Sequence, residues 1–220
     1  MRASRSRVTY KLLLRIDKGY QISEADKQML SSVKSLEWGT YKITKLPNSM
    51  GVLKNLSELR IRSKELSDIS ALRNLASLST LELSNTGVSD ISVLRNLTSL
   101  STLNLSNTQV NDISALSGLK SLHTLDLSGI KIKDLSALSG LCALKRLNIQ
   151  NSKTTSIPKC LLDFNLNFIT EQKEYVYYYG EGIYIHGLTL TDQPIEIFSQ
   201  RRELIRAYYR EGEQVPVNEC

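Results

Sequence analysis

The sequence has few cysteines, prolines and histidines, and it has no long apolar run. Its three cysteines, Cys142, Cys160 and Cys220, are odd in number and show no C-x-x-C spacing. This argues against a disulfide framework and against a zinc site. Cys142 lies inside a repeat, where we expect a small buried side chain. The cysteine spacing gives no reason to expect a bound metal. No apolar stretch approaches the roughly 18 residues that a membrane-spanning helix needs, so we do not expect a membrane partner either.

Catalytic motifs are also missing. The chain has no G-x-x-x-x-G-K-[ST] loop for phosphate binding. His123 and His186 have no acidic partner at ligand spacing, and no serine pairs with a histidine and a carboxylate. The basic start lacks the apolar core and cleavage site of a signal peptide. We therefore predict a cytoplasmic chain that is not itself an enzyme and needs no cofactor or small-molecule ligand.

What the sequence does contain is a repeat of 22 residues. The copies carry the pattern L-x-x-L-x-x-L-x-L, with isoleucine as the last residue in two of them, and this pattern resembles that of leucine-rich repeats. An earlier copy from Leu30 is one residue longer. The pattern predicts an α/β fold, namely a leucine-rich-repeat solenoid of about six 22–23-residue repeats spanning residues 30–168. The regular copies begin at Leu53, Leu75, Leu97, Leu119 and Leu141.

The spacing of the leucines also predicts how each repeat folds. Leu103 and Leu105 are two residues apart, so in a strand they face one side while Asn104 faces the other. Stacked repeats then bury the leucines together and form a concave sheet of parallel strands. On the convex side, we expect a serine in each Asp-Ile/Leu-Ser motif to cap a short helical turn. These serines are Ser70, Ser92, Ser114 and Ser136.

The concave face is the candidate protein-binding surface. Its middle is polar, its ends are charged, and it lacks the Trp and Tyr anchors that often dominate binding energy. A solvated face without a tight ligand is therefore the alternative. The predicted central column is Glu37, Arg60, Glu82, Asn104, Asp126 and Asn148, with Arg146 beside it at one end.

The flanking segments are predicted to cap the solenoid. Residues 1–29 form a helical N-terminal cap, residues 169–210 a C-terminal cap of a hairpin and a helix, and residues 211–220 a linker. The basic N-terminus could contact nucleic acid or a membrane, but we favour a frayed, solvated terminus. The hairpin is predicted to turn at the loop Gly180-Glu181-Gly182, with Tyr184 following the loop. Tyrosines that could contact another domain, or simply cover the last leucines, are Tyr177, Tyr179, Tyr184, Tyr208 and Tyr209.

The tail resembles the segment that ends the repeats of prokaryotic Roco (LRR-Roc-COR) proteins, although Thr189, Gln193 and Arg201 depart from the family pattern. The resemblance implies a GTP-binding Roc domain downstream in the parent protein. This chain would then be a non-catalytic regulatory module that contacts the Roc and COR domains or another protein. The alternative is a stand-alone leucine-rich-repeat scaffold or effector. The residues that carry the resemblance are Ile183–Leu190, Pro194–Ile197, Gln200, Leu204–Ile205, Tyr208–Tyr209 and Val215–Glu219.

Overall fold

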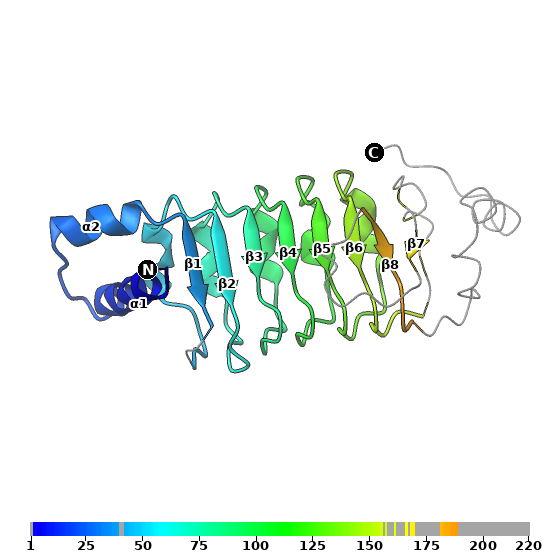
Figure 1. The fold of residues 1–220 in the computed structure, drawn as a ribbon, viewed down its shortest axis with the longest axis horizontal. Helices are drawn as coiled ribbons and strands as arrows, with labels where there is room; N and C mark the ends of the chain where they lie inside the picture. Colours follow the sequence, from blue (N-terminus) through cyan, green and yellow to red (C-terminus); the bar gives the residue numbers. More distant parts are fainter. Residues whose placement is uncertain are drawn as a thin grey trace, which may run out of the picture.

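The computed structural model describes residues 2–39, 42–155, 157, 161, 166, 168–169 and 181–188. One long face of the molecule is a parallel sheet, and a row of short 3₁₀ helices forms the opposite face (Figure 1). Each repeat supplies one strand and most supply one 3₁₀ helix, and neighbouring repeats stack along the long axis. This arrangement confirms the predicted solenoid.

Within the described residues, the sheet has eight strands in the order β1-β2-β3-β4-β5-β6-β8-β7, and all neighbours are parallel. Equivalent repeat positions pair directly, so Leu81 lies opposite Leu103 and Leu103 opposite Leu125. The strands are β1 (Ser35–Trp38), β2 (Glu58–Ile61), β3 (Thr80–Glu82), β4 (Thr102–Asn104), β5 (Thr124–Asp126), β6 (Arg146–Asn148), β7 (Phe168–Ile169) and β8 (Gly182–Tyr184).

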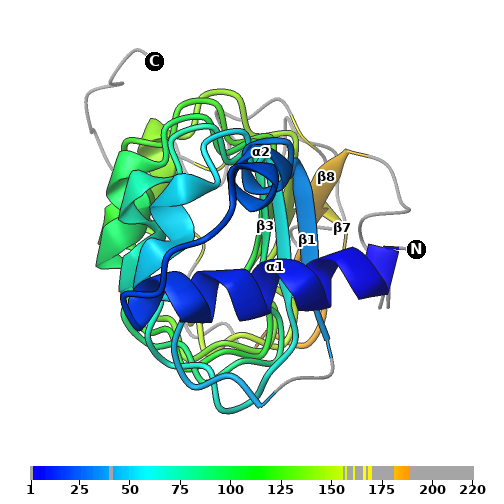
Figure 2. The ribbon, with the colours of Figure 1, turned by 90° about the vertical axis from the view of Figure 1, so that its left-hand side faces the viewer.

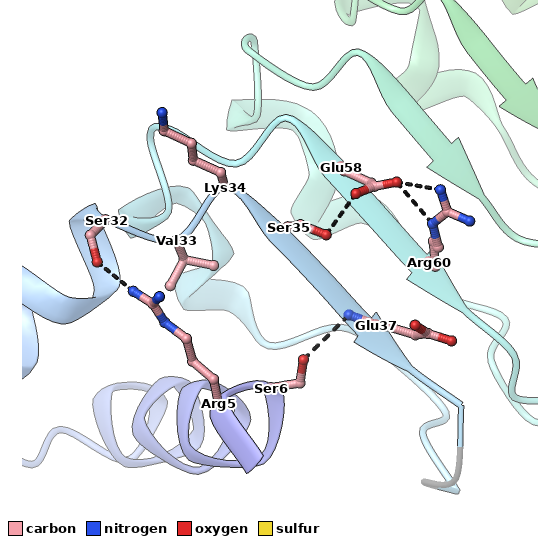
Figure 3. A pocket seen from close by; sticks show the side chains of 9 residues that line it. All are labelled: Arg5, Ser6, Ser32, Val33, Lys34, Ser35, Glu37, Glu58 and Arg60. Atoms are coloured by element: carbon pink, nitrogen blue, oxygen red, sulfur yellow. Dashed lines mark hydrogen bonds and ion pairs between the residues drawn. The ribbon is translucent and has the colours of Figure 1, made fainter. Parts of the chain in front are cut away.

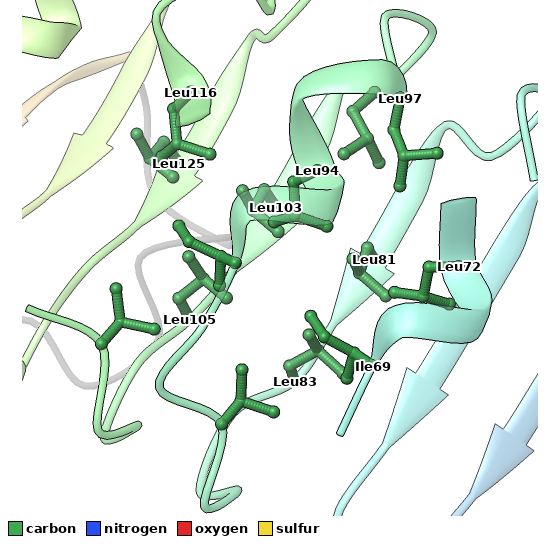
Figure 4. Packing of buried hydrophobic residues seen from close by; sticks show 14 of the residues in the cluster. Ile69, Leu72, Leu81, Leu83, Leu94, Leu97, Leu103, Leu105, Leu116 and Leu125 are labelled. Atoms are coloured by element: carbon green, nitrogen blue, oxygen red, sulfur yellow. The ribbon is translucent and has the colours of Figure 1, made fainter. Parts of the chain in front are cut away.

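Leucines fill the space between the sheet and the 3₁₀ helices (Figure 4). Leu83, Leu94, Leu103 and Leu105 have no exposed surface. Each such side chain contributes about 1.5–3 kcal/mol through burial, and it reaches full burial only because the next repeat covers it. Cys142 departs from our expectation, because it is exposed and not part of this core.

The 3₁₀ helices begin differently from the prediction. The serines are their first residues, and no serine side chain caps them. Instead the carboxylate two residues earlier accepts the serine N–H, as in an Asx-turn, at 2.9 Å for Asp68 and 2.8 Å for Asp90. The 3₁₀ helices are η1 (Asn48–Val52), η2 (Ser70–Asn74), η3 (Ser92–Asn96), η4 (Ser114–Leu116) and η5 (Ser136–Gly140).

Two helices form the N-terminal cap: α1 (Arg2–Asp17) and α2 (Glu24–Ser31). Helix α1 crosses the end of the solenoid beside β1 (Figure 2). Ser6 accepts the indole N–H of Trp38 through its backbone carbonyl at 3.3 Å, and Leu12 and Leu13 are buried. The helix therefore covers the edge strand, which would otherwise expose unpaired backbone groups. A helical cap is confirmed, and the expectation of a frayed terminus is wrong.

The last strands differ from the prediction. Tyr184 was expected to lie in a hairpin that turns at residues 180–182, but β8 has parallel neighbours, β6 and β7, on both of its edges. Its backbone continues the solenoid, because Asn151 N–H donates to His186 C=O at 2.9 Å. The sheet thus reaches beyond the predicted last repeat residue, 168. The expected helix of the C-terminal cap and the linker over residues 211–220 lie outside the described residues.

Candidate functional site

The strand register brings the predicted central column together. Glu37 pairs with Arg60, Arg60 with Glu82, and Glu82 with Asn104 along the sheet. Asp126 and Asn148 follow in line. The structure adds Tyr184, which pairs with Asn148 and continues the row. The alternation Ile183-Tyr184-Ile185 matches Leu147-Asn148-Ile149 and was the sequence signal for this position.

Accessibility falls along this row from the N-terminal to the C-terminal end. Glu37 is exposed, and Arg60, Glu82 and Asn104 are half-buried. Asp126 keeps only 7% of its surface exposed and Asn148 only 5%. We call the accessible part of this row, together with Glu58 beside Arg60 on β2, the open concave surface; its residues are Glu37, Glu58, Arg60, Glu82 and Asn104.

Of the tyrosines predicted to contact another domain, the structure describes only Tyr184. Tyr184 is 0% exposed, so its side chain has no free surface to offer a neighbouring domain. Tyr177, Tyr179, Tyr208 and Tyr209 lie outside the described residues. Arg146, at the far end of the face, is half-buried and donates to Thr124 Oγ1 at 3.4 Å.

An ion-pair network fixes the charged end of the open concave surface. The Arg60 guanidinium binds the carboxylate of Glu58 on its own strand, and its Nη1 lies 3.0 Å from Glu82 Oε1 on β3. The hydrogen bond to Glu58 is the main cause that raises the pKa of Arg60; burial opposes it and the charge of Glu82 adds to it. Ser35 Oγ donates to the second Glu58 oxygen at 2.7 Å. The guanidinium is thus held in place before any partner arrives.

A cavity of about 460 Å³ adjoins this network, between α1 and the first two strands (Figure 3). Arg5 Nη2 donates to Ser32 Oγ at 2.6 Å on one side of it. Glu37 and Arg60 of the predicted central column line the cavity, but no pattern in the chain could place α1 beside β1. Its lining is Arg5, Ser6, Ser32, Val33, Lys34, Ser35, Glu37, Glu58 and Arg60.

The middle of the concave face is ordered by a repeated hydrogen-bond motif. Asn104 Oδ1 accepts from Ser106 N–H at 2.9 Å and from Ser106 Oγ at 2.7 Å. Asp126 makes the same two bonds to Ser128, and its second oxygen accepts from Asn148 Nδ2 at 3.0 Å. Burial raises the pKa of Asp126, and these bonds oppose the rise.

This arrangement can recognise a partner through hydrogen bonds and charge. In the described part of the chain, no three or more His, Cys, Asp or Glu side chains gather as a metal site. His123 is exposed, and its Nδ1 lies 2.7 Å from the carbonyl oxygen of Ser121. Among the described helices, none combines the length and apolar character needed to cross a bilayer.

Comparisons with known proteins agree with the fold. Residues 76–118 match the family model for leucine-rich repeats (two copies). An internalin of Listeria monocytogenes is similar in structure, with a TM-score of 0.65 and 24% identity over 86% of this chain. Internalin C2 of the same organism gives a TM-score of 0.55 and 21% identity over 82% of this chain. A TDR receptor gives a TM-score of 0.58 and 20% identity over 66% of this chain.

The chain spans 57% of the first internalin, 92% of internalin C2 and 27% of the receptor. A search of curated protein sequences found no match. At these identities the similarity establishes the fold alone.

Proposed function

The chain is a leucine-rich-repeat solenoid, and we propose that it works as a non-catalytic module that binds a protein partner on its open concave surface. The observation that carries this proposal is the fixed Glu58–Arg60–Glu82 network beside the cavity under α1. A preformed charged group loses little conformational freedom on binding, so more of its interaction energy contributes to affinity. The polar face favours a partner that supplies complementary charges and hydrogen-bonding groups over an apolar one.

We further propose that the partner includes the Roc and COR domains of a cytoplasmic Roco-type GTPase that contains this chain. The support is the tail resemblance, which begins at Ile183 inside the strand β8. Strand β8 pairs with β6 next to the regular repeats, so a segment that begins there could connect the repeats to a following domain. In this proposal, the solenoid biases the GTPase between conformations, and nucleotide hydrolysis belongs to the neighbouring domain.

The test is the parent gene beyond the codon for Cys220. The proposal predicts an apolar strand followed by Gly-x-x-x-x-Gly-Lys-Ser/Thr, because a phosphate-binding loop needs those glycines and that lysine. A stop codon at this point would contradict the GTPase connection. The alternative would then stand, namely a self-contained binding scaffold that uses the same open concave surface for an external protein.

A further inference from the structure

The exposed large apolar side chains of the described residues gather at one end of the molecule. Val8 and Leu14 on α1 are 47% and 37% exposed. Tyr20, just after α1, is 60% exposed, and Val52 in η1 is 38% exposed. Helix η1 lies beside α1, because Asp17 accepts the backbone N–H of its residue Asn48 at 2.8 Å. Each of these side chains therefore leaves part of its apolar surface open to solvent at the same end of the solenoid.

Bases share this face of α1. Lys11 and Arg15 on α1 and Lys18, directly after its last residue, are exposed, and their spacing of four and three residues places them on one side of the helix. Val8 and Leu14 are three residues before and after Lys11, so they flank the same stripe. Within the described residues, no ion pair involves these three bases.

No acid from α1 balances the stripe. Asp17 is the one acidic residue among residues 1–20. Its two carboxylate oxygens accept the N–H groups of Asn48 and Ser49, each at 2.8 Å, and so it anchors η1. On the nearby helix α2, Glu24 is paired with Lys27 at 2.6 Å. The outer face of α1 is therefore both cationic and partly apolar.

We propose that this face of α1 docks the solenoid on an anionic lipid bilayer. Lipid phosphates and carboxylates attract the bases, while Val8 and Leu14 can enter the boundary between headgroups and acyl chains. Tyrosine favours that boundary because it combines an apolar ring with a polar hydroxyl. A nucleic acid could pair its phosphates with the lysine and arginine side chains, but it would leave the apolar side chains without a partner. A second copy of this face would set like charges against each other.

The test is cosedimentation of the 220-residue chain with large unilamellar vesicles. We expect binding to phosphatidylcholine vesicles that contain about 30 mol% phosphatidylserine, weaker binding as salt rises from about 50 to 200 mM, and little binding to phosphatidylcholine alone. The triple variant Lys11→Glu, Arg15→Glu, Lys18→Glu should lose about tenfold or more in affinity. The double variant Val8→Ser, Leu14→Ser should lose several-fold at unchanged charge.

A second triple variant is the matched control. Lys131→Glu, Lys133→Glu, Lys153→Glu changes the net charge equally at exposed sites in later repeats, and it should keep most of the binding. Circular dichroism melts would verify that every variant is folded. Equal losses from both triple variants would overturn the proposal, because net charge would then explain the binding. Failure of the chain to bind the anionic vesicles would also overturn it. So would a serine double variant that keeps full vesicle affinity, if the unchanged chain also bound a short DNA duplex more tightly than the vesicles.

Discussion

Single leucines set the stability of each rung. Leu103 is fully buried between β3, β5 and the 3₁₀ helices, whereas the adjacent Asn104 lies on the concave side. We predict that Leu103→Ala lowers the free energy of unfolding by about 2–5 kcal/mol, because it leaves a cavity. Asn104→Ala should cost only about 1 kcal/mol, since it removes the two bonds to Ser106. Urea titrations would measure both, and the reverse order would place the strand one residue out of phase.

The aspartates that start the 3₁₀ helices should make the fold sensitive to acid. The hydrogen bonds from Ser92 lower the pKa of Asp90 below its ordinary value of 3.8. A carboxyl group with a lowered folded pKa stabilises the protein above the unfolded pKa and loses that contribution as pH falls. We predict that Asp90→Asn, which keeps an acceptor oxygen but cannot ionise, reduces the loss of stability below about pH 4. Denaturation midpoints from pH 3 to pH 7 would show it.

Asp126 should have the opposite effect on the same pH scale. Its pKa is raised by burial, so its ionisation opposes folding, and stability should fall as pH rises from near 3.8 through the raised value. Asp126→Asn should remove that fall in stability and leave the loss of stability below about pH 4 unchanged. If Asp90→Asn and Asp126→Asn changed stability over the same pH range in the same direction, the claim that the two carboxyl groups have opposite pKa shifts would be wrong.

At the scale of the element, the close approach of η5 to the end of η4 depends on Gly140. A Cβ at Gly140, in η5, would lie 2.3 Å from the carbonyl oxygen of Ser117. The equivalent residue one repeat earlier, Gly118, has nothing within 4 Å of its Cβ position. We predict that Gly140→Ala costs about 1–3 kcal/mol through overpacking, while Gly118→Ala stays within about 0.5 kcal/mol. Thermal melts compare the two, and equal effects would contradict the close contact.

Elements inside the regular repeat were predictable, and the irregular ones were not. The period and the alternation around Leu103 fixed the strand phase, because a shift of one residue would expose every leucine. The helix starts were missed because Asp-Ile-Ser offers two side chains that can bond the same turn, and the aspartate prevails. Strand β8 was missed as a rung because Tyr184 follows Asn148 outside the 22-residue period.

The candidate site was predicted in composition but not in extent. The column from Glu37 to Asn148 follows from the period alone. Sequence could not reveal that Asp126 and Asn148 are nearly buried, nor that α1 contributes Arg5 to a cavity beside Glu37, since both depend on contacts between distant segments. These contacts move the candidate site to the N-terminal half of the sheet.

Over the whole molecule, the repeats stack along the long axis of the solenoid, and the features suited to recognition lie at its N-terminal end. Each repeat contacts chiefly its neighbours, so a damaged rung weakens adjacent interfaces and leaves distant ones intact. The N-terminal end combines the covered edge strand β1, the ion-pair network of Arg60 and the cavity. A protein partner that binds there would contact side chains already held by the fold.

The most direct test is photo-crosslinking inside cells that express the parent protein. A benzoylphenylalanine replaces Ser84, which is half-exposed on the concave side beside Glu82, or Asn96, which is exposed on the convex side in η3. We predict a defined protein adduct from position 84, none from position 96, and a weaker adduct when Arg60→Glu is added. An adduct from position 96 alone, or equal adducts from both positions, would contradict binding on the open concave surface.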